Sequence, residues 1–538
     1  MVTRRRLIQA SGVIGASAFA TLNTPALIQA AEHLLAPASR RADLTGTRSI
    51  AVIRAGTASD ELGIRAGAGV QPSGPQAIAA LRDGRLAVLD TVNSRISYLS
   101  GGQPSHVQPL PGSIFALDLE VLGRGIAVLD PSAGALFEAR SSSVTAQTLS
   151  RAGLNAVSRL TRFQDFAILV EEDFFTYDAR IGRAGRVEGY PDPAGGRITV
   201  TYGGSGPARR RHAVIRQGGG VEFHVVTTYD LASVIALGRD DAGRLYLQIT
   251  EIVPSQGGLD VDITLRRFAQ DGAAAGAARV PVRGRHAHPR RVACFAPNGD
   301  AYALFPEATR VRILELVWSA TVAPLAPIVS RIQLPKFAAN AALDIANCRQ
   351  TAIDIGNKYA HCTHSGGSWT ATSANLWERN GALLPWYLGG GPGTYYELPY
   401  CWGGMHLPEG FIQKMNEGWM AGNRNYEQPG YVDQTSGVDC SGMIQQCWGV
   451  GGTIKQDDTM LMNWVTESGT QDVYAYLYPG DMWRLPGSHV RMHHYYPDTG
   501  GGDYMYEATL DWGAKCYHTF RPWSDYPDYR WCKGNFVC

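Results

Sequence analysis

The residue whose type and setting most suggest chemistry is Cys440, where a tight turn passes into a helical pattern. The segment reads Gly437-Val438-Asp439-Cys440-Ser441-Gly442-Met443-Ile444-Gln445-Gln446-Cys447-Trp448. A helix N-terminus offers free N–H groups and the positive end of the helix dipole, which favour thiolate over thiol. Because the thiolate is the competent nucleophile, the position predicts covalent catalysis and a depressed pKa for Cys440. A buried structural cysteine is the alternative, and the motifs around Cys440 argue against it.

Four blocks in the last 200 residues or so resemble, in this order, the NlpC-type cysteine endopeptidases, which are bacterial cell-wall hydrolases with a papain-like core. The blocks are Pro399-Tyr400-Cys401-Trp402-Gly403-Gly404, Asp439-Cys440-Ser441-Gly442, Tyr478-Pro479-Gly480-Asp481-Met482 and His489-Val490-Arg491-Met492. A Gly-rich hairpin then leads to Tyr506-Glu507-Ala508, where the family places its third polar catalytic residue just before the Ala. Each block alone is a weak signal, and the specificity comes from their order.

The resemblance implies a catalytic triad of Cys440, His489 and Glu507. Cys440 would attack an amide carbon, and His489 would hold an ion pair with the thiolate and then protonate the leaving amine. Glu507 would orient the imidazole through its other nitrogen. The family usually has His, Asn or Gln at this third place, so Glu507 is a departure. His493 and His494 compete for the base role, and the spacing and neighbours of His489 favour His489.

Four residues are expected to bind substrate beside the nucleophile: Tyr400, Trp402, Asp439 and Ser441. Tyr400 resembles the family tyrosine that lines the site. The backbone N–H of Cys440 is the natural oxyanion donor at a helix start. Residues 405 to 436 form an insertion that the family lacks, rich in aromatic residues, and a segment of this length is expected to overhang and reshape the cleft.

The cysteines predict disulfides in an oxidising compartment. Eight of the nine follow residue 340, and once Cys440 is kept as a thiol seven of these remain, so another must be unpaired or bond to Cys294 or another chain. A Cys348–Cys362 disulfide is favoured over a zinc site that would add His361 and His364. A second possible metal site would use His286 and His288 on one strand face of the earlier domain. We favour the alternative that these two histidines lie exposed in a loop. We therefore expect no metal and no cofactor.

The first thirty residues read as an export signal. Arg4-Arg5-Arg6 precede a weakly apolar run, Ala10 to Leu22, and small residues follow at Ala30-Ala31. The paired arginines resemble a twin-arginine signal, which exports folded proteins to the periplasm or beyond. The alternative is an ordinary first helix with a basic start.

Residues 44 to 335 read as short strands in recurring units. Segments of similar pattern are Gly84–Asp90, Arg124–Asp130, Phe166–Val170, Arg244–Gln248 and Asp300–Leu304, and the first two are offset by 40 residues. Such a period is typical of a β-propeller. The length favours six blades over seven, residues 72 to 99 resemble an NHL-type blade, and a long β-sandwich array is the alternative fold.

Composition supports two separately built domains in the 538 residues. Among six lysines only Lys336 precedes residue 340, and among twelve tryptophans only Trp318 does. With 49 basic and 48 acidic residues, the net charge of +1 gives no support for nucleic acid or an anionic membrane as the main partner. No run of 18 apolar residues occurs, so no membrane span is expected.

These observations predict a multidomain chain. A signal peptide, 1–30, precedes an all-β propeller, 44–335, and an α+β papain-like cysteine hydrolase domain, 338–538, that opens with a helix from Ala338 to about Tyr359. The leading hypothesis is cleavage of an amide bond in peptidoglycan stem peptides, with the propeller as a docking or regulatory module for a protein or glycan. Two alternatives stay open: another amide, ester or protein substrate, or a propeller binding protein with an inert cysteine domain.

Overall fold

The computed structural model describes most of the chain from residue 44 onward. The described residues are 44–67, 70–111, 115–123, 125–131, 133–140, 143–149, 154, 157–172, 175–180, 182–203, 211–253, 260–327, 345–362, 367–428, 430–469, 477–497, 501–526 and 529–534. The expected signal peptide, with Arg4 and Arg5, lies outside them, as does the expected helix start at Ala338. No helix in these ranges is long and apolar enough to cross a membrane.

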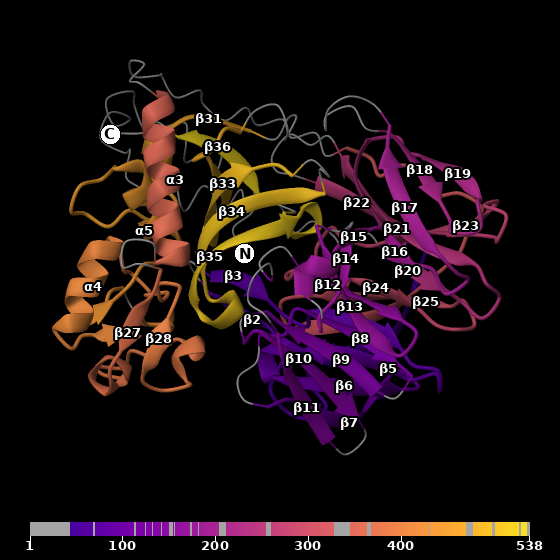
Figure 1. Ribbon diagram of the computed structural model, residues 1–538, viewed down its shortest axis with the longest axis horizontal. Coiled ribbons are helices and arrows are strands. Elements are labelled where there is room, and N and C mark those ends of the chain that lie inside the picture. The colour runs from indigo at the N-terminus through magenta and orange to yellow at the C-terminus, as the bar shows by residue number, and fades with distance from the viewer. Residues whose placement is uncertain are drawn as a thin grey trace, which may run out of the picture.

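Residues 47 to 316 form six four-stranded antiparallel sheets (Figure 1). In chain order the sheets are β4 (Ala77–Ala80), β5 (Leu86–Asp90), β6 (Arg95–Ser100) and β7 (Gln103–Pro109); β8 (Asp118–Leu122), β9 (Gly125–Asp130), β10 (Ala135–Arg140) and β11 (Ser143–Thr148); β12 (Val157–Phe163), β13 (Phe166–Glu171), β14 (Phe175–Asp178) and β15 (Val187–Glu188); β16 (Tyr190–Pro191), β17 (Arg197–Tyr202), β18 (His212–Arg216) and β19 (Glu222–Val226); β20 (Asp230–Arg239), β21 (Leu245–Val253), β22 (Asp260–Phe268) and β23 (Ala274–Val280); and β24 (Ala293–Phe295), β25 (Ala301–Pro306), β26 (Arg310–Leu316) and β1 (Thr47–Arg54).

The six sheets close into a ring, which makes this part of the chain a β-propeller. Each sheet shares a buried apolar cluster with the next one along the chain. A further cluster, with Ile53 and Ile313 of the last sheet and Val88 of the first, closes the circle. β1 pairs with β26, so strands from both ends of the propeller complete one blade. The propeller prediction is therefore confirmed, and the described sheets agree with six blades.

The recurring segments of the sequence are the second strands of five blades: β5, β9, β13, β21 and β25. An inner strand lies between two neighbouring sheets, so both of its faces are covered and its residues are apolar without alternation. All five residues of β5 are buried, for example. The second strand of the remaining blade is β17, and the sequence pattern did not reveal it. Its sequence, Arg197–Tyr202, contains two threonines and alternates between buried and less buried residues, as a half-covered strand does.

The C-terminal part is built on a six-stranded antiparallel sheet in the order β31-β36-β32-β33-β34-β35. Its strands are β31 (Val465–Gly469), β32 (Met482–Leu485), β33 (His489–Tyr495), β34 (Gly502–Thr509), β35 (Lys515–Pro522) and β36 (Arg530–Gly534). The helices are α3 (Ile345–His361), α4 (Pro408–Asn416) and α5 (Cys440–Trp448), and two small pairs are β27 (Trp369–Ala371) with β28 (Gly393–Tyr395) and β29 (Met420–Ala421) with β30 (Thr435–Ser436).

The sheet lies between the helices and the propeller (Figure 1). Side chains alternate along each strand. Val490 and Met492 of β33 join the cluster of α3 and α5. Met505 of β34 and Trp483 of β32 instead join a cluster with the last two blades. One face of the sheet is therefore the helix face and the other is the propeller face.

A hairpin between β1 and β4 links the two parts. Its strands are β2 (Arg65–Gly67) and β3 (Val70–Ser73), which pair with each other and with no blade. Arg65 contacts Asp511 of the C-terminal part at 3.4 Å. The side-chain oxygen of Gln71 accepts a hydrogen bond from Arg491 of β33. The propeller thus sends a segment directly onto the propeller face of the sheet.

Candidate functional site

Cys440 is the first residue of α5, as the sequence predicted. Asp439 is the N-cap: its backbone is extended, and its carboxylate accepts the Gly442 N–H at 2.7 Å. The other carboxylate oxygen accepts the Gly403 N–H at 3.0 Å. One carboxylate therefore ties the Trp-Gly-Gly turn to the start of α5.

The glycines of these two blocks are required by close backbone packing. A Cβ at Gly442 would lie 2.2 Å from the Gly404 carbonyl oxygen, far inside van der Waals contact. That same carbonyl accepts the Asp439 N–H at 3.1 Å. The turn and the helix start are therefore held together at a separation that admits no side chain.

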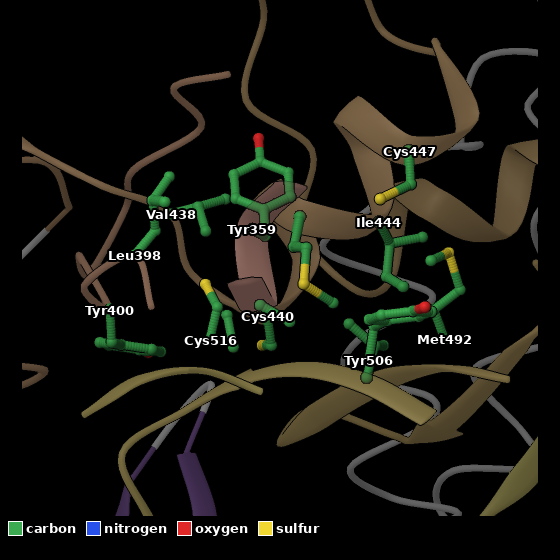
Figure 2. Packing of buried hydrophobic residues seen from close by; sticks show 14 of the residues in the cluster. Tyr359, Leu398, Tyr400, Val438, Cys440, Ile444, Cys447, Met492, Tyr506 and Cys516 are labelled. Atoms are coloured by element: carbon green, nitrogen blue, oxygen red, sulfur yellow. The ribbon is translucent and has the colours of Figure 1, made fainter. Parts of the chain in front are cut away.

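The start of β33 lies against Cys440. α5 packs on β33, and the backbone N–H of Val490 interacts with the Cys440 sulfur. Figure 2 shows Cys440 between α5 and the strands, in a layer with Tyr400 and Tyr506. His489 is the residue before Val490 and the first of its strand. Cys440 therefore lies on the helix face, against the backbone of β33 at Val490, whereas the His489 side chain lies on the propeller face of the same strand.

His489 is bonded to Glu507, the residue predicted as its partner. The Nε2 atom of His489 lies 3.2 Å from a Glu507 carboxylate oxygen, and both side chains are buried. The same carboxylate accepts from Arg491 Nε at 3.0 Å and from Arg521 Nε at 2.6 Å. These two guanidinium groups and His489 hold the pKa of Glu507 well below its usual range, against the effect of burial.

Arg491 and Arg521 are the members of this cluster that sequence reasoning missed. A signal was present in the pattern: Arg491 lies two residues after His489, so a strand puts both on one face. Arg521 lies on β35, the neighbour of the Glu507 strand. Nothing in the sequence alone shows that β34 and β35 pair in a register that brings Arg521 to Glu507.

The predicted depressed pKa of Cys440 is wrong for this structure. Burial, and after it the Asp439 carboxylate, raise the pKa of the thiol to about 12, while Lys455 and the Val490 N–H act in the opposite direction. Burial also lowers the pKa of His489. The resting site therefore holds a thiol and a neutral imidazole. The physical reason is first the burial of the sulfur and second the anionic helix cap beside it.

The competing histidines are bonded elsewhere. His493 Nδ1 lies 2.7 Å from an Asp503 oxygen, and the other Asp503 oxygen accepts the Trp483 indole N–H at 2.7 Å. His494 Nδ1 lies 2.9 Å from His518 Nε2. Each is the centre of its own polar contact, away from the Cys440 end of β33.

The four residues expected to bind substrate divide into two kinds. Tyr400 is buried, and its hydroxyl has no hydrogen-bond partner among the described residues. Burial raises the pKa of Tyr400, and the electrostatic effect of Cys440 is the next largest cause of that shift. The other three hold the scaffold. Asp439 caps α5, Ser441 donates to Asp439 at 3.2 Å, and the Trp402 indole N–H donates to the Gln428 carbonyl at 2.9 Å.

The insertion 405–436 is held together by contacts between its own residues. It carries α4, β29 and β30, and Lys414 lies over the Trp419 ring at 4.2 Å. The Tyr431 hydroxyl donates to the backbone of Thr435 within the same segment. Tyr426 lies within electrostatic reach of Arg65, so the insertion approaches the propeller hairpin as well as the nucleophile turn.

A cavity lies between the propeller and the propeller face of the sheet. It has about 770 Å³ of empty space, including its open mouth. Its charged lining is Arg65, Arg290, Arg521, Asp511 and Asp525. Arg521 is the residue that bonds Glu507, so the cavity adjoins the His489–Glu507 pair.

Among the described cysteines the expected disulfides are present at Cys348 alone. Seven described cysteines form no disulfide: Cys294, Cys362, Cys401, Cys440, Cys447, Cys516 and Cys532. Cys348 is disulfide-bonded, and none of these seven is its partner, so the Cys348–Cys362 pairing is wrong. All seven lie in packed interiors, where a thiol behaves as a small apolar side chain. A disulfide-bonded Cys348 also has no thiolate to offer zinc.

His286 and His288 lie in the loop between β23 and β24, not on a strand. The strand-face geometry of the disfavoured metal reading is therefore absent at these two residues. His288 lines the cavity between the two parts of the molecule.

No protein-family model matches the chain, and no curated protein matches it. Solved structures that are similar to part of it include a streptogramin B lyase, with 14% identity, a TM-score of 0.28, and coverage of 46% of this chain and 95% of that one. A virginiamycin B lyase from Staphylococcus aureus has 12% identity, a TM-score of 0.28 and coverage of 46% and 96%. A chain of a mitotic checkpoint complex has 12% identity, a TM-score of 0.31 and coverage of 52% and 94%. The propeller assignment rests on the six closed sheets, and likeness at these scores carries no functional argument.

Proposed function

We propose that the protein is an exported cysteine hydrolase of the papain-like NlpC type that cleaves an amide bond in peptidoglycan stem peptides. The observation that carries the proposal is the arrangement at the start of β33. Cys440 begins α5 against the Val490 N–H, and the preceding residue, His489, is bonded through Nε2 to a buried carboxylate. Acyl transfer needs a nucleophile, a base and an orienting group, and the proposal assigns these roles to Cys440, His489 and Glu507.

His489 acts as a general base rather than as half of a resting ion pair. Its Nε2 is committed to Glu507, which leaves Nδ1 to take the proton of the Cys440 thiol as sulfur attacks the amide carbon. The Cys440 N–H at the helix start stabilises the oxyanion. The imidazolium then gives its proton to the leaving amine. Water, deprotonated by His489, hydrolyses the thioester and regenerates the thiol.

Glu507 favours the imidazolium that forms in this cycle. Its depressed pKa keeps it a carboxylate over the whole working pH range. Arg491 and Arg521 share its charge, which fixes its position but weakens its pull on His489. The arrangement therefore orients the ring strongly and stabilises its protonated form moderately.

The test uses purified mature protein and defined muropeptides, with products read by mass spectrometry. A new free amine on the diamino acid, made by wild type and absent with Cys440→Ser, supports cleavage between D-glutamate and that residue. Intact muropeptides, with Cys440 still reactive to an electrophile, would leave a hydrolase of another amide, ester or protein and remove the cell-wall substrate.

One observation favours a second candidate, a propeller binding protein with an inert cysteine domain. Cys440 is buried, and its pKa is raised to about 12. An inert domain predicts that neither iodoacetamide nor a thioester substrate modifies Cys440 in the folded protein. Modification of Cys440 at a rate that falls in a His489→Ala variant excludes that candidate.

Export belongs to the proposal because an enzyme of the cell wall must reach it. Replacing the pair by Arg4→Lys with Arg5→Lys should leave folded protein in the cytoplasm, as twin-arginine signals require both arginines. Cell fractionation measures this. Normal export of the double variant would show that the segment is not such a signal.

A further inference from the structure

Arg65 of the propeller hairpin lies in the cavity beside the proposed catalytic site. Tyr400 connects the two: it is within electrostatic reach of both the Cys440 sulfur and the Arg65 guanidinium. On the other side, Asp511, which contacts Arg65, acts on His489. Arg65 therefore has two neighbours, Tyr400 and Asp511, of which the first acts on Cys440 and the second on His489.

Arg65 is held in place but keeps hydrogen-bonding capacity. Its guanidinium lies over the Trp386 ring at 5.0 Å and makes one long contact, 3.4 Å, with Asp511. Its Nε atom is buried and has no acceptor among the described residues. A buried guanidinium donor without an acceptor is costly, and a ligand acceptor would remove that cost.

The other cations of the cavity are already paired. Arg290 contacts Asp525 at 3.2 Å, and Arg521 bonds Glu507. Near Arg65, by contrast, a second cation is added: Arg424 lies over the same Trp386 ring at 4.5 Å. Burial lowers the pKa of Arg424. The repulsion between the two guanidinium charges lowers it further, while Glu378 acts in the opposite direction. Two guanidinium groups therefore lie close together at this end of the cavity, with Asp511 acting on Arg65 and Glu378 acting on Arg424.

We propose that the cavity between the propeller and the sheet is the substrate pocket, and that Arg65, delivered by the β2–β3 hairpin, binds a carboxylate of the substrate there. The inference rests on the proposed hydrolase function and names the substrate group that the site selects. A carboxylate fits because the guanidinium fork offers it two parallel donors, Nε and one Nη, and because the buried Nε has no acceptor among the described residues.

The propeller then forms part of the catalytic site. A propeller that only docked the enzyme to a surface would place no charged donor in a cavity that adjoins the His489–Glu507 pair. Here the hairpin contributes Arg65 to the cavity lining and Gln71 to the Arg491 contact. Selection of a substrate carboxylate by one domain and attack by the other would make hydrolysis depend on both.

The experiment compares two alkylating agents that differ in charge, iodoacetate and iodoacetamide, on Cys440 of the full chain. The ratio of their rates is referred to the same ratio for a small thiol in solution. We expect wild type to favour iodoacetate. Arg65→Gln should lower the ratio of the two rates about tenfold, since a hydrogen bond to a charged group is worth roughly 1.5–3 kcal/mol. Arg65→Lys should keep part of the preference for iodoacetate. Arg85→Gln, at an exposed pair with Asp83, is the matched control and should leave the ratio unchanged.

A second measurement does not depend on cysteine reactivity. Calorimetric binding of N-acetyl-D-glutamate and of its diamide to the Cys440→Ala protein should show acid binding that Arg65→Gln abolishes, and no diamide binding. If Arg65→Gln does not fold, Arg65→Lys and the acid–amide comparison in wild type decide. Equal ratios in all variants, together with equal binding of acid and diamide, overturn the proposal. Carboxylate binding that requires Arg65, with Cys440 inert to both reagents, keeps the pocket and removes the hydrolase.

Discussion

At the scale of single residues, the Asp439 carboxylate has two opposed effects on Cys440. As N-cap it starts the helix that presents the sulfur, and as a neighbouring anion it raises the thiol pKa. Lys455 Nζ, 3.0 Å from the same carboxylate, offsets part of this effect. The dipole of a nine-residue helix is too small to outweigh burial, since its favourable effect on an adjacent charge is typically 0.3–1 kcal/mol.

The first prediction follows from the raised thiol pKa. The rate of iodoacetamide modification of Cys440 should increase with pH up to pH 10 without a plateau, because the pKa of the buried thiol is about 12. Peptide mapping by mass spectrometry measures the rate at Cys440, with Cys440→Ser as the background. A plateau reached below pH 8 would mean a thiolate in the resting enzyme.

The second prediction concerns the buried ion cluster of Glu507. Glu507→Ala should lower the free energy of unfolding by about 3–5 kcal/mol, because Arg491 and Arg521 would keep their charges without the carboxylate that compensates them. Denaturant unfolding measures the loss. Glu417→Ala, at an exposed surface pair with Lys414, is the control and should leave the free energy of unfolding nearly unchanged. A similar small cost at Glu507 would contradict the role of the cluster.

At the scale of elements, the site depends on how closely α5 approaches the Trp-Gly-Gly turn. Helix propensity alone would favour alanine at Gly442 by up to about 1 kcal/mol. An alanine Cβ at position 442 would lie 2.2 Å from the Gly404 carbonyl oxygen, so the substitution is unfavourable in spite of helix propensity. The carbonyl belongs to backbone that is itself bonded to Asp439, so it has little freedom to move.

The third prediction tests this packing. Gly442→Ala should reduce hydrolysis by about a hundredfold, because a shift of about 1 Å at a reacting group can cost that much. The control is Gly410→Ala in α4, where an added Cβ meets nothing within 4 Å. Its activity should equal that of wild type. Comparable activity in the two alanine variants would show that the close approach has no catalytic importance.

At the scale of the whole molecule, burial between the propeller and the helices leaves several histidines neutral. Burial lowers the pKa of His494 to about 4 and that of His518 to about 3, and it also lowers the pKa of His489. In the unfolded chain the same groups titrate near pH 6.5. As pH falls below about 6.5 the unfolded chain therefore takes up protons before the folded protein does, and stability is lost.

The fourth prediction is an acid-sensitive fold. The melting temperature should change little between pH 9 and pH 7.5 and should fall steadily from pH 6.5 to pH 4. The depressed pKa of Glu507 acts in the same direction below about pH 4.5, because its ion pairs are lost on protonation. Scanning calorimetry across this range measures the effect. A constant melting temperature down to pH 5 would mean that the buried histidines are accessible to protons in the folded state.

By itself, the sequence determined the features that depend on local pattern. The inner strands of the blades were visible because full burial makes them continuously apolar, and Cys440 at a helix start was visible because a turn precedes a helical period. The partnership of His489 and Glu507 followed from the resemblance and is present in the structure. Tertiary structure alone decided what depends on long-range approach. Arg65 and Arg521 reach the site from distant parts of the chain, seven described cysteines pack without forming a disulfide, and burial reversed the direction of the Cys440 pKa. Desolvation and non-local pairing are properties of the assembled fold, and no window of the sequence contains them.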